Sequence, residues 1–221
     1  MSAFDRPALT PLQQLKLADE ELAAARQTSD PRRLALALAA CAELWNDGGA
    51  FKRAHELYDE CLPLIRAHGT DEQLAKVLCS MQTCLVQTRQ PHLALVYGME
   101  ALELFTLQGH TLGIASTLIN LTNAQRALGQ YAQCRDGLLR AVELLKDSPD
   151  PQFLAMTLVN LAVALATMDD FAAAQLKLHE ARRLAVRRRL AHMLPNIDSL
   201  LELFRQGQLP SGVVPAKQFF S

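Results

Sequence analysis

Cysteine and histidine are the residue types in this chain that could carry metal or nucleophilic chemistry, and their spacing argues against both. The five cysteines and six histidines among 221 residues show neither a disulfide framework nor the spacing of a zinc site. Cys79 and Cys84 lie on one predicted helix, where they point about 140° apart and cannot share a ligand. No histidine is paired with a plausible Ser or Cys nucleophile, and no glycine-rich phosphate loop is present. We therefore expect no catalytic residue, no metal and no cofactor.

Arginine forms the strongest charge cluster, over residues 182–189. Cations near the end of a helix favour the negative end of its dipole. A solvated face that can also dock an acidic partner explains the cluster better than a nucleic-acid site, which would have interleaved aromatic residues. The net charge of −1 gives no general attraction to nucleic acid or to an anionic membrane. The candidate acidic-partner patch consists of Arg182, Arg183, Arg187, Arg188 and Arg189.

The composition favours a helical protein. Half of the residues are hydrophobic and 5% are aromatic, and the chain is rich in Ala and Leu and poor in residues that favour strands. The first residues resemble neither a signal peptide nor a transit peptide. No apolar run approaches the roughly 20 residues that span a bilayer. We therefore expect an all-α protein located in the cytoplasm.

Turn and capping residues divide the chain into helices. Thr10-Pro11 is typical of an N-cap followed by proline in the first turn, and glycine or proline clusters separate the later helices. We predict a flexible leader (1–9), a single helical repeat domain (10–206) and a flexible tail (207–221). Within the domain we expect an N-terminal helix over 10–27, helix pairs over 31–68, 71–108, 111–147 and 151–189, and a C-terminal capping helix over 193–206.

The four helix pairs repeat with a period of 40 residues, without insertion or deletion. The first helix of each pair carries a leucine, followed three residues later by another apolar residue. The second helix carries small residues, which let neighbouring helices approach closely. Cysteines in these series should therefore act as small buried apolar residues. The series are Leu38, Leu78, Leu118 and Leu158; Cys41, Met81, Leu121 and Leu161; Ala54, Ala94, Cys134 and Ala174; and Cys61, Ala101, Ala141 and Ala181.

The order of these residues resembles the tetratricopeptide repeat (TPR), a helix-turn-helix unit that stacks on copies of itself. The resemblance covers about residues 32–189. It departs from the pattern where the first helix normally carries glycine, because residues 42, 82, 122 and 162 are Ala, Gln, Thr and Ala. The pattern is clearest at Leu118, Leu121, Gly129, Tyr131, Cys134, Leu138 and Ala141.

The period of 40 residues is longer than the usual 34 or so. It is similar to the long-period branch of the family found in bacterial peptide-sensing regulators and some adaptor scaffolds. The resemblance implies a right-handed α-solenoid of antiparallel helix pairs. It also implies that partners bind on a concave face lined by the first helix of each pair.

Several polar residues project to this implied face. Asn is a poor helix former, yet Asn120, Asn123 and Asn160 lie there, where a side-chain amide can donate to and accept from the backbone of an extended peptide. Alternatively, Asn120 and Asn160 only cap or bridge neighbouring turns. The candidate partner-binding residues are Glu43, Lys76, Ser80, Thr83, Gln87, Ser116, Asn120, Asn123, Arg126, Met156 and Asn160.

A carboxylate clamp, which holds the terminal carboxylate of a peptide, fits the sequence poorly. Asn123 and Asn160 are in suitable places, but Ile119 and Leu200 stand where the resemblance expects Lys and Arg. Without those cations the carboxylate would have little to pair with.

These observations favour a non-catalytic protein–protein interaction module or scaffold that binds a peptide or partner protein in the groove. Two alternatives stay open. The chain is a regulatory or sensory unit that controls an effector, or it is a self-assembling homo-oligomer whose end helices and C-terminal Phe219-Phe220 dock into a neighbour. We expect neither a nucleic-acid nor a membrane partner.

Overall fold

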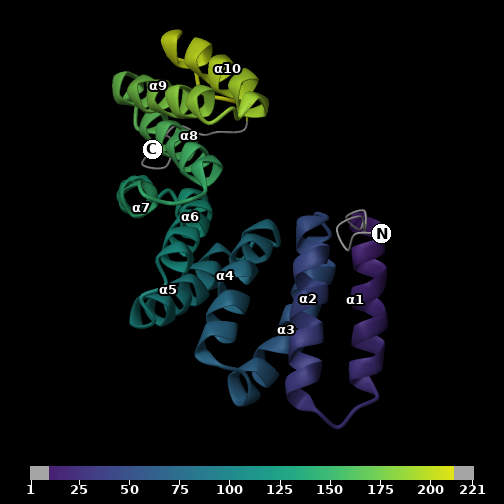
Figure 1. The fold of residues 1–221 in the computed structure, drawn as a ribbon. Helices are drawn as coiled ribbons and strands as arrows, with labels where there is room; N and C mark the ends of the chain where they lie inside the picture. The colour runs from purple at the N-terminus through teal and green to yellow at the C-terminus, as the bar shows by residue number, and fades with distance from the viewer. Residues whose placement is uncertain (1–9, 212–221) are drawn as a thin grey trace, which may run out of the picture. The chain divides into compact units, whose positions relative to one another are not determined.

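The structure, a computed structural model, describes residues 10–211, which form α-helices and one short 3₁₀ helix and contain no strand. Figure 1 shows helices that run back and forth and are joined by short turns. The expected all-α fold of helix pairs is therefore confirmed. The predicted leader (1–9) and the end of the predicted tail (212–221) lie outside the described residues. The elements are α1 (Pro11–Arg26), α2 (Pro31–Asp47), α3 (Phe51–His68), α4 (Asp71–Gln87), α5 (Pro91–Leu107), α6 (Thr111–Ala127), α7 (Tyr131–Leu145), α8 (Pro151–Thr167), α9 (Phe171–Arg187), η1 (Ala191–Met193) and α10 (Leu194–Arg205).

Local sequence fixes where the helices begin. Thr10 and Gln13 form a capping box at the start of α1, and Thr70 and Gln73 form the same box at the start of α4. Asp30 caps α2 by accepting hydrogen bonds from two backbone N–H groups of the first turn. Such caps satisfy N–H groups that the helix itself leaves unpaired. The helices accordingly begin and end within two residues of the predicted ranges.

The turn inside each helix pair repeats one backbone conformation. Gly49, Arg89, Gly129 and Asp169 are spaced by 40 residues and have φ of 76°, 63°, 71° and 65°. A left-handed conformation costs about 1–2 kcal/mol for a residue with a Cβ. Arg89 and Asp169 therefore adopt it because the helices packed on either side require it. The repeat is one of backbone geometry as well as of residue type.

The chain forms two compact units, which we describe separately. The first, residues 1–104, contains α1 to α4 and most of α5. In it α1 packs on α2, α2 on α3 and α3 on α4, and α2 also touches α4. The second unit, residues 105–221, contains α6 to α10, each of which packs on the next. The expectation of one continuous domain over residues 10–206 stays a prediction.

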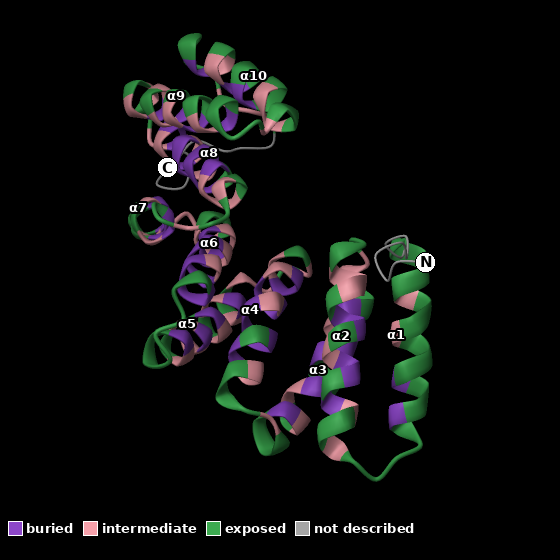
Figure 2. Cartoon of the chain, viewed as in Figure 1, coloured by how far each residue is buried: buried purple, intermediate pink, exposed green. Residues whose placement is uncertain are grey.

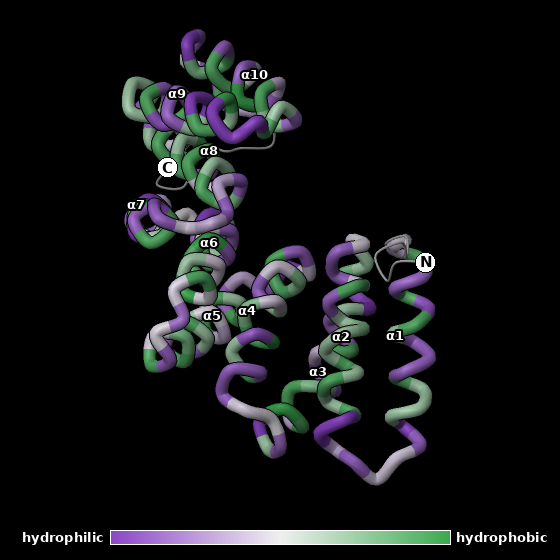
Figure 3. Tube along the Cα trace, viewed as in Figure 1, coloured by the Kyte–Doolittle hydropathy of each residue, from purple (hydrophilic) through white to green (hydrophobic). Residues whose placement is uncertain are grey.

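The helices bury one side and leave the other open (Figure 2). Hydrophobic and hydrophilic residues alternate along them to match (Figure 3). The leucines at 38, 78, 118 and 158 are at most 6% exposed, and the small residues at 54, 94, 134 and 174 at most 3%. Small side chains at a helix contact let the backbones approach closely. These two series therefore form the stacking seam, the name used below for the buried positions at which helices pack.

All five cysteines are buried, and none forms a disulfide. The Cys61 thiol donates a hydrogen bond to the carbonyl oxygen of Ala35 over 3.3 Å. Burial raises the pKa of Cys41, Cys84 and Cys134 to about 11 and the pKa of Cys61 to about 12. These thiols act as small packing groups and hardly ionise near neutral pH.

Ion pairs with the same 40-residue spacing join second helices in the first unit. Arg26 Nη2 lies 2.6 Å from Glu60 Oε2, and Arg66 Nη1 lies 2.6 Å from Glu100 Oε1. All four side chains are partly exposed, so each pair contributes at most about 1 kcal/mol. The pairs mark the register of the stack, whereas the buried seam stabilises it.

Enlarging a seam residue should destabilise the protein. We expect Ala174→Leu in α9 to lower the free energy of unfolding by about 1–3 kcal/mol, because added methylenes overpack a full contact. Ala172→Leu is the matched control, since Ala172 lies on the same helix and is exposed. Urea denaturation followed by circular dichroism measures both variants. A wild-type curve for Ala174→Leu would show that this series is not the seam.

Stability should fall as the pH rises above about 9. An unfolded thiol ionises near its ordinary pKa of 9.0, whereas the buried thiols keep their protons until about 11 or 12. The unfolded state then binds fewer protons, so the free energy of unfolding decreases between these pKa values. Below pH 9 the contribution is complete.

Urea denaturation at pH 7 and pH 10 measures this loss. The variant Cys61→Ala with Cys134→Ala carries the residue that the other repeats have at both positions. It should lose less stability between the two pH values than the wild type. An equal loss would show that the buried thiols are not responsible.

Candidate partner-binding face

The side of the first helices that faces away from the seam carries all eleven predicted binding residues. On α2, α4, α6 and α8 the leucine series is buried, and the predicted residues are exposed or half-buried. This arrangement follows from the helical period, which separates the two sets on one helix. Whether these side chains bind a partner stays a prediction. We call the set the first-helix face: Glu43, Lys76, Ser80, Thr83, Gln87, Ser116, Asn120, Asn123, Arg126, Met156 and Asn160.

In the first unit this face lies on α2 and α4, which touch each other. Lys76 on α4 is already engaged, because its Nζ lies 2.6 Å from Oε1 of Glu72, one turn earlier. Glu43 on α2 is exposed and forms no ion pair with any residue that the structure describes. The α2 side of the face therefore presents an uncompensated negative charge.

In the second unit the face lies on α6 and α8. The structure brings Arg126 and Asn123 together, since Arg126 Nη2 donates to Asn123 Oδ1 over 3.2 Å. Asn120 and Asn160 stand at the same position of successive repeats, and both are half-buried. The second unit thus presents amides and one arginine, with no acidic residue among the predicted six.

Two residues near Glu43 were missed by sequence reasoning. Tyr58 on α3 is 1% exposed, and its hydroxyl forms no hydrogen bond. Asp47 is the last residue of α2 and is exposed. Both interact electrostatically with the Glu43 region, since burial and then the carboxylates of Glu43 and Asp47 raise the pKa of Tyr58. A signal existed, because residues 98, 138 and 178 of the other repeats are Gly or Leu.

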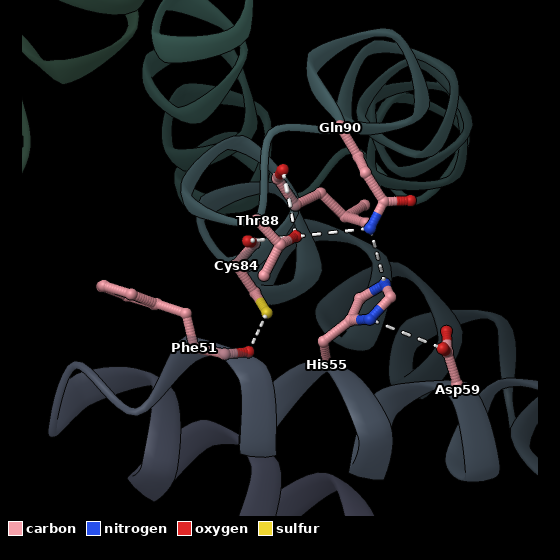
Figure 4. Close-up of polar contacts among 7 residues, drawn as sticks. Phe51, His55, Asp59, Cys84, Thr88 and Gln90 are labelled. Atoms are coloured by element: carbon pink, nitrogen blue, oxygen red, sulfur yellow. Dashed lines mark hydrogen bonds and ion pairs between the residues drawn. The ribbon is translucent and has the colours of Figure 1, made fainter.

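The arrangement closest to an acid–base site lies between α3 and the turn after α4 (Figure 4). His55 Nδ1 lies 3.6 Å from Asp59 Oδ2, and His55 Nε2 lies 3.3 Å from the amide nitrogen of Gln90. An amide NH₂ is a donor only, so His55 Nε2 accepts and the ring proton faces Asp59. Gln90 also donates to the Thr88 hydroxyl over 3.4 Å.

Neither potential nucleophile near this histidine is available for catalysis. The Thr88 hydroxyl lies 3.0 Å from the carbonyl oxygen of Cys84 and donates to it. The Cys84 thiol donates to the carbonyl oxygen of Phe51 over 2.9 Å, and burial raises its pKa to about 11. A nucleophilic cysteine needs a lowered pKa and access to solvent. The network therefore ties α3 to the α4–α5 turn.

The arginine patch lies on the second unit, at the end of α9 and just beyond it. Arg182 Nε pairs with Asp198 Oδ1 of α10 over 2.7 Å. The other four arginines of the patch are exposed and form no ion pair with the residues that the structure describes. The predicted patch is thus a surface with four free cations.

Searches of residues 10–211 for two other kinds of site gave nothing. This part of the chain contains no group of three or more His, Cys, Asp or Glu residues that could hold a metal ion. It also contains no helix with the length and apolar character needed to cross a membrane.

Comparison with known proteins gives no sequence relative. No protein-family model matches the chain, and no curated protein matches it.

Solved structures do resemble the fold. BtubC (BKLC) from P. vanneervenii has a TM-score of 0.70 and 23% identity, over 79% of this chain and 72% of that one. The apo form of RapI has a TM-score of 0.77 and 16% identity, over 88% and 71%. Aspartyl phosphate phosphatase F from Bacillus subtilis has a TM-score of 0.68 and 13% identity, over 92% and 52%, so this chain spans about half of it. The chain has the fold of a TPR-like helical repeat protein.

Proposed function

We propose that this chain is a non-catalytic interaction module in the cytoplasm that binds an extended segment of a partner protein or peptide on its first-helix face. One observation carries the proposal. Polar residues recur at equivalent accessible positions of α2, α4, α6 and α8, while the opposite side of the same helices is buried in the seam. Folding explains the buried side, and it does not require the polar residues on the open side.

Amides are the groups on this face best suited to a peptide backbone. Asn120 and Asn160 are half-buried at equivalent positions of α6 and α8. Each side chain offers two donors and an acceptor, so it can pair with both the C=O and the N–H of an extended strand. Asn costs helix stability relative to Ala, and contact with a partner is the benefit that offsets this cost.

The polar network around His55 supports binding in preference to catalysis. Its hydroxyl and thiol donate to backbone carbonyls and so have no free proton or lone pair directed at a substrate. One structural neighbour is named a phosphatase, but at 13% identity the likeness concerns the fold alone. Control of an effector through the bound partner is compatible with the same face.

The arginine patch supports a second contact in the second unit, with an acidic partner segment. Four exposed arginines without ion pairs attract carboxylates over a distance of about 10 Å at ordinary ionic strength. This contact would speed association more than it would strengthen the complex.

Removing both amides tests the proposed face. We expect Asn120→Ala with Asn160→Ala to reduce the capture of partners from a native lysate at least about fivefold, because each amide hydrogen bond contributes about 0.5–1.5 kcal/mol. Helicity and the urea midpoint should stay at wild-type values or rise slightly, since Ala favours helices.

The matched control is Gln133→Ala with Asn196→Ala, which removes two exposed amides from α7 and α10. It should capture as much as the wild type. Unchanged capture by the Asn120 and Asn160 variant would place the binding site on the second helices or on the arginine patch.

A further inference from the structure

The C-terminal end of α2 carries two carboxylates one helical turn apart. Glu43 and Asp47 are both exposed, and neither forms an ion pair with the residues that the structure describes. At a spacing of four residues they share one side of the helix and repel each other. The nearest lysine of the face, Lys76, is held by Glu72 at 2.6 Å. The unit therefore provides no cation for this acidic pair.

The helix itself makes the position worse for negative charge. The C-terminal end of a helix carries the negative end of the macrodipole. In the first unit α1 and α3 follow the usual rule and place arginine in the last turn, Arg26 and Arg66 respectively. The last turn of α2 contains no basic residue, and the helix ends on Asp47. Two carboxylates and a helix end thus combine without compensation, at a cost to folding stability.

A buried polar group lies beneath this acidic pair. The Tyr58 hydroxyl is shielded from solvent and has no hydrogen-bond partner. The carboxylates of Glu43 and Asp47 are close enough to raise its pKa, after burial itself. Ser80 on α4 is also near and lowers that pKa, but no hydrogen bond of normal geometry joins the two hydroxyls. Buried polar groups are nearly always paired in native proteins, so this hydroxyl marks an incomplete arrangement.

We propose that Glu43 and Asp47, with the Tyr58 hydroxyl beneath them, form a subsite for the cationic side chain of an arginine or lysine in the bound partner segment. This inference rests on the proposed function, because it assigns a chemical preference to the part of the first-helix face that lies on α2 and α4.

A bound cation would relieve each of the unfavourable features. It neutralises the repulsion between the carboxylates and the unfavourable interaction with the helix end. A carboxylate has two oxygens and accepts several hydrogen bonds. One oxygen of Glu43 can accept from the guanidinium while the other accepts from Tyr58, which completes the pairing of the buried hydroxyl. Binding should therefore weaken steeply as salt is added.

A capped pentapeptide, acetyl-Ala-Ala-Arg-Ala-Ala-amide, is a direct probe, titrated into ¹⁵N-labelled full-length protein and followed by backbone amide shifts. We expect saturable shifts at the end of α2 and around Tyr58, and none with the same peptide carrying Gln in place of Arg. The variant Glu43→Gln with Asp47→Asn should bind about tenfold more weakly, and Tyr58→Phe about threefold, as expected for lost hydrogen bonds to charge.

Two comparisons separate this role from a structural one. The control Glu20→Gln with Glu103→Gln makes the same charge change at exposed positions of the first unit and should bind like the wild type. The variant Glu43→Gln with Asp47→Asn should also have a higher urea midpoint than the wild type, because it removes the repulsion. Equal shifts with the Gln peptide, or equal weakening in the control, would overturn the subsite.

Failure of this subsite and failure of the proposed function give different results. If the arginine peptide does not bind while partner capture still depends on Asn120 and Asn160, the subsite is wrong and the binding face stands. If the peptide binds and capture ignores the two amides, the proposed face in the second unit is wrong.

Discussion

The structure depends on the fact that one helix pair cannot bury its own apolar stripe. Each pair exposes leucines and small residues that only the next helix can cover, so the elements must pack in sequence within each compact unit. Contacts of this kind are short-range along the chain, and stability becomes a sum over neighbours. The strict 40-residue spacing is the consequence, because one inserted residue would rotate the later side chains by about 100°. The same demand holds Arg89 and Asp169 in a left-handed turn that glycine occupies in the equivalent repeats.

A helix constrained on one side is free to vary on the other. The first helices use this freedom to carry polar residues that folding does not need. In the second unit these are chiefly amides, which suit a peptide backbone. In the first unit they include the carboxylates at the end of α2, which lower stability and are therefore difficult to explain by folding. A feature that costs stability and gains nothing within the chain is a better indication of binding than one that merely sits on the surface.

Sequence reasoning succeeded where a feature is local or periodic. Thr10, Thr70 and Asp30 act within three residues of themselves, so the helix ends were predictable, and the leucine series identified the buried side. Tyr58 escaped because the importance of its hydroxyl depends on α2 and α4, which lie 11 or more residues away along the chain. The His55 network was invisible for the same reason, since Gln90 is 35 residues from it. Whether Glu43 and Asp47 find a cation is likewise a question of tertiary contacts.

The central claim is that packing and binding use opposite sides of the same helices. Hydrogen–deuterium exchange on the protein alone and saturated with the partner it captures tests this claim most directly. The account predicts that bound partner slows exchange in α2, α4, α6 and α8 and leaves α3, α7 and α9 nearly unchanged. Slower exchange confined to α3, α7 and α9 would show that the partner binds the second helices, and would contradict the account.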